Sequence, residues 1–381
     1  MHGHRIISAD SHVNEPEAAW ERIPKDLREK GPHFVQNPPG KKGLHMVFDG
    51  YTPDPVGATF TAGRKRADGS IREAIENFTW DSFPGPWEPN ARIVDMDKDG
   101  VEVEVLFPSM GRNLYGLKAS EAALQQAGMR SYNDWLADYS KVAPKRLIAL
   151  ALLSGTNVEW SLQEMQRCVK NGHKGVMLPS GLPDGLTYAD PRYEPLWSAA
   201  ADLGIAIHYH INIVEGADRT ANRQAATSLP SIGRRAIRRS ALEALDLLSD
   251  LTFGGVLDRH PKLNVVMAEY DLGWILPFMT KMDSGLKRAR SENRDAQKMS
   301  LLPSELVRRQ VFITFQEDIG GLMGARAIGL TDNCLWASDY PHGGSTWPDS
   351  LEAIRTQTAS LSAAETEKIV WSNASKLYSL H

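Results

Sequence analysis

The sequence has little cysteine, no long hydrophobic run and little net charge. Cys168 and Cys334 are the only two cysteines among 381 residues, and they stand far apart with no CxxC spacing, which argues against a disulfide framework. No run approaches the roughly 18 apolar residues that a membrane span needs, and the first residues carry no apolar segment of the kind found in secretory signals. We therefore expect a cytoplasmic protein whose two thiols are reduced and buried.

The charge balance argues against a general attraction to polyanions. The 43 basic and 47 acidic residues leave a formal net charge of −4, which predicts no attachment to nucleic acid or to an anionic membrane. One basic run, at 234–239, is interpreted as a solvated helix face or as a surface that pairs with acidic groups of a partner. A hydrophobic fraction of 42% is ordinary for a globular protein with a sizeable core. The expected partner is a small-molecule substrate.

Short apolar, β-branched runs recur along the chain, each followed by turn residues and by a stretch with helical spacing. This alternation is typical of a parallel sheet covered by helices. The eight expected strands are 5–9, 101–107, 147–153, 175–178, 205–208, 264–268, 311–315 and 334–338. The expected helices between them are 121–140, 157–171, 191–203, 240–259, 272–290, 303–309, 320–328 and 351–357. The pattern predicts an α/β fold, a closed (β/α)8 TIM barrel that spans 1–381 as one domain.

A long segment at 13–90 interrupts the pattern after the first strand. It is rich in proline, glycine and aromatic residues and shows little helical period. Because it follows a barrel strand, it is expected to emerge at the carboxyl ends of the strands and to cover the active-site face. Its aromatic residues, Trp80 among them, form a substrate pocket or pack against a second subunit, and the sequence leaves both interpretations open.

Acidic and histidine residues stand at four of the expected strand ends. They are Asp10, His12, His208, Glu269 and Asp339. Residues at the carboxyl ends of barrel strands converge on one site, and all five residues are of types that bind metal ions. Asp10 and His12 are two residues apart, so on an extended backbone their side chains point to the same side.

Each of these signals also has a structural interpretation. The Asp10-Ser11-His12 tripeptide is commonly a turn in which the aspartate accepts a backbone N–H. A histidine that ends an apolar strand, such as His208, is usually a hydrogen-bonded core residue, and Glu269 could form a salt bridge with a buried arginine. The metal-binding interpretation rests on four separate strand ends that each offer a ligand type.

Several longer segments then follow in an order that is specific for one family. They are ADSHVNEP, RIVDMDKDGVEVEVLFPS, NDWLADYSKVAPKRLIALALL, GHKGVMLPS, GIAIHYH, GVLDRHPKLNVVMAEYDLGWI and WASDYPHGGSTWP. Together they resemble the amidohydrolase-2 family, the branch of the metal-dependent amidohydrolase superfamily that includes aminocarboxymuconate-semialdehyde decarboxylase and resorcylate-type decarboxylases. The resemblance extends from about residue 5 to residue 375 and does not identify a substrate.

The resemblance implies a barrel that holds one divalent metal ion, with zinc expected and manganese or Fe(II) as alternatives. The first-strand motif of the family is HxH or carries a glutamate, and here it is Asp10-x-His12. The family's fifth-strand histidine ligand is assigned to His208 and its eighth-strand aspartate to Asp339, while His210 is assigned to the substrate side. Barrels of this family are commonly dimeric, so a homodimer is expected.

Two further residues are assigned to the chemistry. Where many family members have a histidine after the sixth strand, this chain has Glu269, which is either a base for metal-bound water or a metal ligand. His342, three residues after Asp339, is placed to hydrogen-bond a substrate or the groups around the metal. The predicted catalytic residues are thus Asp339, Glu269 and His342, and Trp80 and His210 are predicted to contact the substrate.

Charge then favours one reaction over another. Three ionised carboxylates, Asp10, Glu269 and Asp339, around one divalent cation leave a negative site. Such a site repels a further carboxylate unless arginine or histidine residues compensate, so we expect hydrolysis of an amide, lactone, ester or thioester. Decarboxylation of an aromatic or muconate-type acid is the alternative reaction. A non-catalytic metal-binding barrel is the alternative without chemistry.

Overall fold

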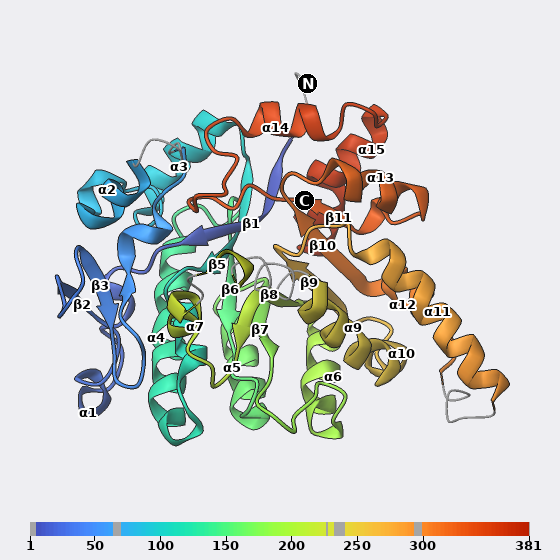
Figure 1. Ribbon diagram of the computed structural model, residues 1–381, viewed down its shortest axis with the longest axis horizontal. Coiled ribbons are helices and arrows are strands. Elements are labelled where there is room, and N and C mark those ends of the chain that lie inside the picture. The colour runs from blue at the N-terminus through green and yellow to red at the C-terminus, as the bar shows by residue number, and fades with distance from the viewer. Residues whose placement is uncertain (1–4, 64–69, 226–227, 232–240, 293–298, 381) are drawn as a thin grey trace.

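The structure is a computed structural model that describes residues 5–63, 70–225, 228–231, 241–292 and 299–380. The basic run at 234–239 lies outside these ranges. Eight parallel strands pair in sequence order: β1 (Ile7–Val13), β5 (Val103–Pro108), β6 (Leu147–Leu152), β7 (Gly175–Gly181), β8 (Ala206–Val214), β9 (Asn264–Ala268), β10 (Val311–Phe315) and β11 (Cys334–Trp336). With the helices that surround them, the strands form the predicted (β/α)8 barrel (Figure 1). Within the described residues, no helix is long and apolar enough to cross a membrane.

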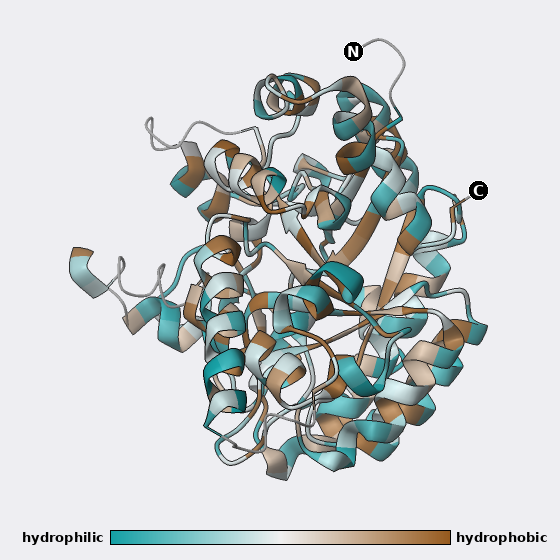
Figure 2. Ribbon diagram, turned by 90° about the vertical axis from the view of Figure 1, so that its right-hand side faces the viewer, coloured by the Kyte–Doolittle hydropathy of each residue, from teal (hydrophilic) through white to brown (hydrophobic). Residues whose placement is uncertain are grey.

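Apolar strands fill the inside of the barrel and amphipathic helices cover it. Every residue of β6, with the sequence LIALAL, is buried, and Figure 2 shows the strands as the most hydrophobic part of the ribbon. The covering helices are α4 (Ala122–Ser140), α5 (Val158–Lys170), α6 (Glu194–Leu203), α9 (Glu243–Phe253), α10 (Val256–Arg259), α11 (Ile275–Ser291), α12 (Pro303–Gln310), α13 (Ile319–Ala327) and α14 (Ser350–Gln357). Strands buried on both faces, with helices outside, are the expected arrangement for a parallel sheet.

Local signals explain several of the boundaries. The Asn157 side chain accepts a hydrogen bond from Trp160 N at 3.1 Å and caps the start of α5. Gly204 has a φ of 65° and ends α6 in the left-handed conformation, which favours glycine. The expected strands 264–268 and 311–315 have the observed bounds. The strand expected at 205–208 runs instead to Val214, because the alternation continues through a histidine and an asparagine that resemble turn residues.

The barrel closes between its first and last strands through a mixture of backbone and side-chain hydrogen bonds. Asp339 N donates to Asp10 O at 2.9 Å, and His12 N donates to Tyr340 O at 2.6 Å. Below these contacts the hydroxyls of Ser8, Ser11 and Ser338 lie 2.8 to 3.1 Å from one another. This closure holds the two acidic strand ends side by side.

The segment after β1 carries a small sheet of its own. Three short antiparallel strands, β2 (His33–Gln36), β3 (Leu44–Val47) and β4 (Asp54–Pro55), pair beside the barrel, at the left of Figure 1. This segment also carries α1 (Lys25–Arg28), α2 (Ser70–Glu76) and α3 (Pro89–Asp99), while α7 (Arg219–Ala225) follows β8, and α15 (Ala363–Glu367) and α16 (Asn373–Leu377) lie near the C-terminus. At Asp54 the segment is tied by ion pairs to the chain that follows β8.

Candidate metal centre

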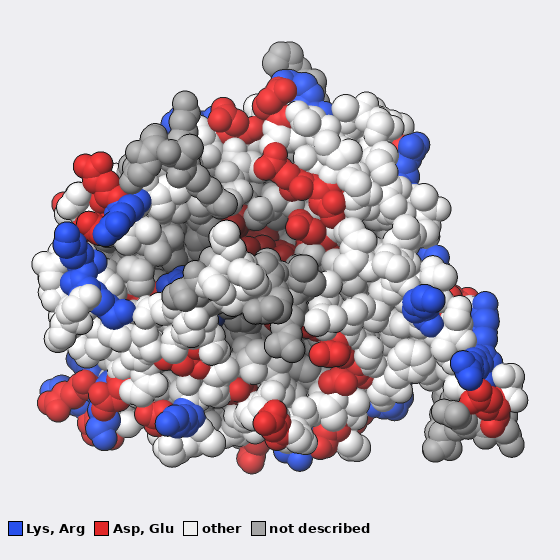
Figure 3. Space-filling view, viewed as in Figure 1, with Lys and Arg blue, Asp and Glu red and all other residues white. Residues whose placement is uncertain are grey.

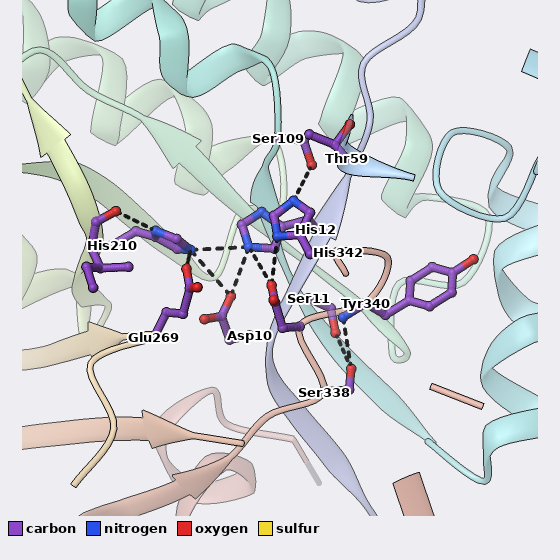
Figure 4. A network of polar contacts seen from close by, with 12 residues as sticks. Asp10, Ser11, His12, Thr59, Ser109, His210, Glu269, Ser338, Tyr340 and His342 are labelled. Atoms are coloured by element: carbon purple, nitrogen blue, oxygen red, sulfur yellow. Dashed lines mark hydrogen bonds and ion pairs between the residues drawn. The ribbon is translucent and has the colours of Figure 1, made fainter. Parts of the chain in front are cut away.

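Ligand-type side chains from three strands meet at the carboxyl ends of the barrel (Figure 4). Asp10 and His12 come from β1, His210 from β8, and Asp339 follows β11. His12 Nε2 lies 3.4 Å from Asp10 Oδ1 and 3.4 Å from Asp339 Oδ1, and His210 Nε2 lies 3.9 Å from Asp10 Oδ1. All four side chains are almost completely buried. We call these four residues the strand-end cluster.

The two histidines of the strand-end cluster face each other with the same nitrogen. His12 Nε2 and His210 Nε2 are 3.2 Å apart, while each Nδ1 is 3.0 to 3.1 Å from a backbone carbonyl, that of Pro108 for His12 and that of Ile211 for His210. A carbonyl accepts only, so each Nδ1 carries the proton and each Nε2 presents a lone pair. Two lone pairs that point at one place, beside two carboxylates, are the donor set of a cation site.

Asp10 is the most strongly perturbed acid of the cluster. Neither of its oxygens makes a hydrogen bond of ordinary geometry to a described residue. Burial raises the pKa of Asp10 well above its usual range, and the charges of Asp339 and Glu269 raise it further, while Arg112 opposes them. A buried carboxylate without donors is unfavourable unless a cation compensates for it. The residues present therefore fit a divalent metal ion.

Glu269 stands at the edge of the strand-end cluster. Its Oε2 lies 3.3 Å from His210 Nε2, and its side chain is 36% exposed. Burial of the carboxyl group and the charge of Asp339 raise the pKa of Glu269 to about 8. Both Glu269 and Asp339 have a positive φ, 63° and 55°, which is uncommon for residues other than glycine. Such backbone geometry concentrates at functional sites, and here it turns both carboxylates towards the barrel mouth.

His342 contacts the cluster from the turn after β11. Its Nδ1 lies 2.8 Å from Asp339 Oδ1, its Nε2 lies 3.2 Å from Ser109 Oγ, and its ring centroid is 4.0 Å from that of His12. His12, Asp339 and His342 form a second group whose ligand atoms are close enough to hold an ion. His342 therefore lies between a carboxylate of the cluster and the Ser109 hydroxyl, and its role in the reaction stays a prediction.

The structure does not bring His208 to the cluster, contrary to its assignment as a metal ligand. Its Nδ1 lies 3.0 Å from Val176 O and its Nε2 lies 2.8 Å from Tyr378 OH, so both nitrogens have partners inside the barrel. A Cβ on Gly175 would lie 2.5 Å from the His208 ring, so glycine makes the room for it. His210, two residues later in β8, is level with Ala268 at the end of β9 and reaches the cluster, although it was expected on the substrate side.

The sequence does not single out two arginines whose charges act on groups of the site. Arg112 lies in the 3-10 turn Gly111–Gly116 after β5, and Arg219 begins α7 after β8. The positive charge of Arg112 lowers the pKa values of Asp10, His210 and Glu269. No local pattern distinguishes these two arginines from the other basic residues of the loops. The only available signal was their position shortly after a barrel strand.

Trp80 packs inside the segment that follows β1. Its ring centroid lies 5.4 to 6.0 Å from those of Phe34, Phe60, Phe78 and Trp87. Edge-to-face contacts of this kind stabilise a compact aromatic group. The contact between Trp80 and a substrate stays a prediction.

A family model matches almost the whole chain. The amidohydrolase family model matches residues 9–380. The chain belongs to the amidohydrolase family. It is 29% identical over 184 residues to 2-amino-3-carboxymuconate-6-semialdehyde decarboxylase from Dictyostelium discoideum, a match that covers 48% of this chain and 47% of that protein. The chain spans about half the length of the first curated relatives that it matches.

Solved structures share the fold along almost the whole chain. An amidohydrolase from Mycobacterium avium subsp. paratuberculosis has a TM-score of 0.77 and 21% identity, with 99% of this chain and 100% of that chain covered. The 5-carboxyvanillate decarboxylase from Novosphingobium aromaticivorans, complexed with manganese and a nitrobenzoic acid, has a TM-score of 0.68 and 17% identity, with 99% and 97% covered. At these identities the likeness shows the amidohydrolase fold.

Proposed function

We propose that the protein is a metal-dependent decarboxylase of an aromatic or similarly unsaturated carboxylic acid. The observation that carries this proposal is the strand-end cluster, a set of metal-ligand side chains in a chain whose curated relatives include decarboxylases of such acids. The expectation of hydrolysis assumed that nothing compensates for the charges of Asp10, Glu269 and Asp339. The charge of Arg112 lowers the pKa values of Asp10 and Glu269, and a cation with this effect offsets part of the negative charge that would repel a carboxylate beside the metal.

Hydrogen bonds fix the backbone of the turn that carries Arg112. The buried carboxylate of Glu15 accepts hydrogen bonds from Met110 N at 2.8 Å and from Gly111 N at 3.1 Å, at the start of the turn that carries Arg112. A Cβ on Gly111 would lie 3.0 Å from Glu15 Oε1, so glycine permits this close approach. The Nε of Arg112 is buried and has no partner among the described residues, so a donor remains for an anionic ligand.

Asp10, His12, His210 and Asp339 would hold the metal ion. Two imidazoles and two carboxylates suit zinc, manganese or Fe(II), and the manganese of the 5-carboxyvanillate decarboxylase structure supports manganese beside zinc. A divalent ion bound there would act as a Lewis acid on an oxygen of the bound acid.

In this reaction Glu269 would transfer a proton, and His342 would position Asp339. When carbon dioxide leaves, the electron pair of the broken C–C bond stays on the substrate carbon, and this carbon must receive a proton. Glu269, beside His210 and partly exposed at the barrel mouth, is placed to deliver that proton and to regain one from solvent. His342 holds Asp339 through the 2.8 Å contact, and Ser109 holds His342.

The test is a comparison of two reactions with the same metal-loaded protein. Hydroxybenzoates and benzene dicarboxylates are incubated with the zinc- and manganese-loaded protein and released carbon dioxide is measured, in parallel with hydrolysis of amides, lactones and thioesters. We expect carbon dioxide from at least one acid and no hydrolysis. Hydrolysis of an acyl substrate without release of carbon dioxide from any acid would refute the proposal. The homodimer expected from the family stays a prediction for sizing chromatography.

A further inference from the structure

One face of α3 carries polar residues that contact the barrel. In its sequence Arg92, Asp95 and Asp99 are spaced by three and four residues, so they lie on the same side of the helix. Asp99 accepts a hydrogen bond from Ser350 N at 2.9 Å, and Asp95 accepts one from the Tyr340 hydroxyl. The polar face of α3 is thus attached to the chain after β11, which supplies a carboxylate of the strand-end cluster.

The guanidinium of Arg92 joins β1 to β5. Its Nη1 donates to His12 O at 2.7 Å, and its Nε donates to Glu104 Oε2 at 2.5 Å. The other oxygen of Glu104 accepts a hydrogen bond from Ser11 Oγ at 3.3 Å. Arg92 therefore holds His12 directly by its carbonyl and indirectly through the neighbouring Ser11.

The same guanidinium lies over the ring of Tyr340, the residue after Asp339. The Cζ of Arg92 is 4.5 Å from the centre of this ring, and a cation over an aromatic face is attracted to it. Tyr340 O accepts a hydrogen bond from His12 N at 2.6 Å, and its ring is directed away from the strand-end cluster (Figure 4). One side chain thus contacts the backbone of His12 and the residue next to Asp339.

These contacts matter for the spacing of two candidate ligands. His12 lies in the first strand and Asp339 follows the last, so only tertiary contacts set the 3.4 Å between His12 Nε2 and Asp339 Oδ1. The basic side chains visible in Figure 3 lie at the surface, where salt screens them, whereas no part of the Arg92 side chain is exposed. Buried contacts are screened much less, so Arg92 can hold both strand ends firmly.

We propose that Arg92 is a positioning residue of the metal centre, which sets the affinity for the divalent ion by holding the backbone of His12 and of the turn at Tyr340. This inference rests on the proposed function, since it concerns the ion that the same site would bind. A guanidinium suits this task because its planar fork donates to two acceptors in fixed directions. A lysine would keep the charge without these directions.

The test is the affinity for zinc and for manganese, measured with each ion alone by competition with a chelator. Arg92→Met should weaken the binding of both ions by about ten- to a hundredfold, as expected when a group that orients a metal ligand is removed. Arg92→Lys should recover part of this loss. The paramagnetic resonance spectrum of bound manganese should also change in Arg92→Met, because the geometry of the ligands determines it.

Arg146 provides a matched control at the other end of β5. Its side chain also donates to backbone carbonyls, to Glu102 O at 2.9 Å and to Val101 O at 3.2 Å, just before the strand begins. Arg146→Met should lower the free energy of unfolding and leave the affinity for both ions at the wild-type value. A folded Arg92→Met variant with wild-type affinity would overturn the inference, since Arg92 would then support the fold alone.

A second variant decides if Arg92→Met does not fold. Removal of Arg92 alone leaves the carboxylate of Glu104 buried and unpaired, whereas the double variant Arg92→Met/Glu104→Gln removes both charges. The double variant should show the same loss of affinity for zinc and manganese. Wild-type affinity in the folded double variant would overturn the inference.

Metal affinity distinguishes this inference from the proposed function. If Arg92→Met binds both ions more weakly while no acid loses carbon dioxide, the decarboxylase proposal fails and the positioning role stands. If an acid loses carbon dioxide and the two proteins bind the ions equally, the positioning role fails and the decarboxylase proposal stands. Wild-type protein that binds neither ion would overturn both.

Discussion

Two histidines of β8 lie in two layers of the barrel interior, and their surroundings differ in kind. His208 lies in the deeper layer, where Val176 O and Tyr378 OH take up its two nitrogens. His210, two residues later, points its Nε2 at the Nε2 of His12 and at two carboxylates. In the deeper layer, the protein supplies a hydrogen-bond partner for both nitrogens of His208. In the layer at the mouth, carboxylates lie beside two histidine lone pairs that face each other.

The same difference separates two buried carboxylates. Glu164, between α4 and α5, accepts hydrogen bonds from Arg130, Arg167 and Asn133, and these partners hold its pKa at about 2 although burial raises it. The oxygens of Asp10 accept no hydrogen bond of ordinary geometry from a described residue, and the charges of Asp339 and Glu269 act against its ionised form. A carboxylate that is fully paired stabilises a fold, and one that is left without partners in a buried site indicates a ligand.

The largest expected effect follows from replacing each of these carboxylates in metal-free protein. Glu164→Gln should lower the free energy of unfolding by about 3 kcal/mol, because it leaves Arg167 without its buried partner. Asp10→Asn should raise it by about 1 kcal/mol, because it removes one of several mutually repelling carboxylates. Urea denaturation in the presence of a chelator measures the free energy of unfolding of both variants. Destabilisation by Asp10→Asn as large as that by Glu164→Gln would contradict the comparison.

A buried histidine outside the cluster should make stability depend on pH. Burial lowers the pKa of His173 to about 4, whereas an unfolded histidine titrates near 6.5. The unfolded chain therefore binds more protons below about pH 6.5, and stability should fall as the pH falls from about 6.5 to 4, by at most about 3 kcal/mol from this residue. His173→Gln should remove that part of the loss, as measured by urea denaturation at pH 7.5 and 5.

The exposed His33 is the matched control for His173. His33→Gln should leave the difference between the two pH values as it is in the wild type. An equal effect of both substitutions would mean that the burial of His173 does not cause the pH dependence.

The third effect concerns Arg112 and the reaction. Arg112→Met should lower kcat/KM for carboxylic acids by about a hundredfold, because one charged interaction with the substrate is lost. Arg112→Lys should lose less, since it keeps the charge without the planar fork. Metal content, measured on the same samples, should stay at the wild-type value. Loss of metal in Arg112→Met would show that the arginine supports the metal centre instead of the substrate.

The smallest expected effect concerns the tie between the inserted segment and the chain after β8. Asp54 holds Arg219 and Arg223 together, and these arginines keep its pKa low although burial raises it. Asp54→Asn should lower the free energy of unfolding by about 2 kcal/mol, because it removes the buried charge that the two arginines share. Urea denaturation measures the effect, with Asp138→Asn, which removes a surface partner of Arg22, as the control. A loss no larger than that of Asp138→Asn would contradict the tie.

Most of the fold could be predicted from the sequence, because strands that are buried on both faces appear in it as continuous apolar runs. The strands at 264–268 and 311–315 show this most clearly. The end of β8 could not be placed in the same way, since His210 and Asn212 interrupt its apolar residues. Polar residues inside a strand are expected only where the barrel interior becomes a site, and that is known only after folding.

The site could be predicted in part for the same reason. Asp10, His12 and Asp339 lie in or just after the first and last strands, and both carboxylates are 3.4 Å from His12 Nε2. The predicted ligand of β8 was His208, whereas His210 lies at the cluster. The two residues are easily confused because they are two apart, and their side chains point to the same side of the strand. Arg112, Arg219 and Asp54 come from separate loops whose meeting depends on tertiary structure alone.

The central claim is that the layer at the mouth is a metal centre and the deeper layer is not. The most direct measurement is metal content by plasma mass spectrometry after loading with zinc or manganese, for wild type, His210→Asn and His208→Asn. We predict about one divalent ion per chain in wild type and in His208→Asn, and loss of the ion in His210→Asn. Retention of the ion in His210→Asn together with its loss in His208→Asn would contradict the account.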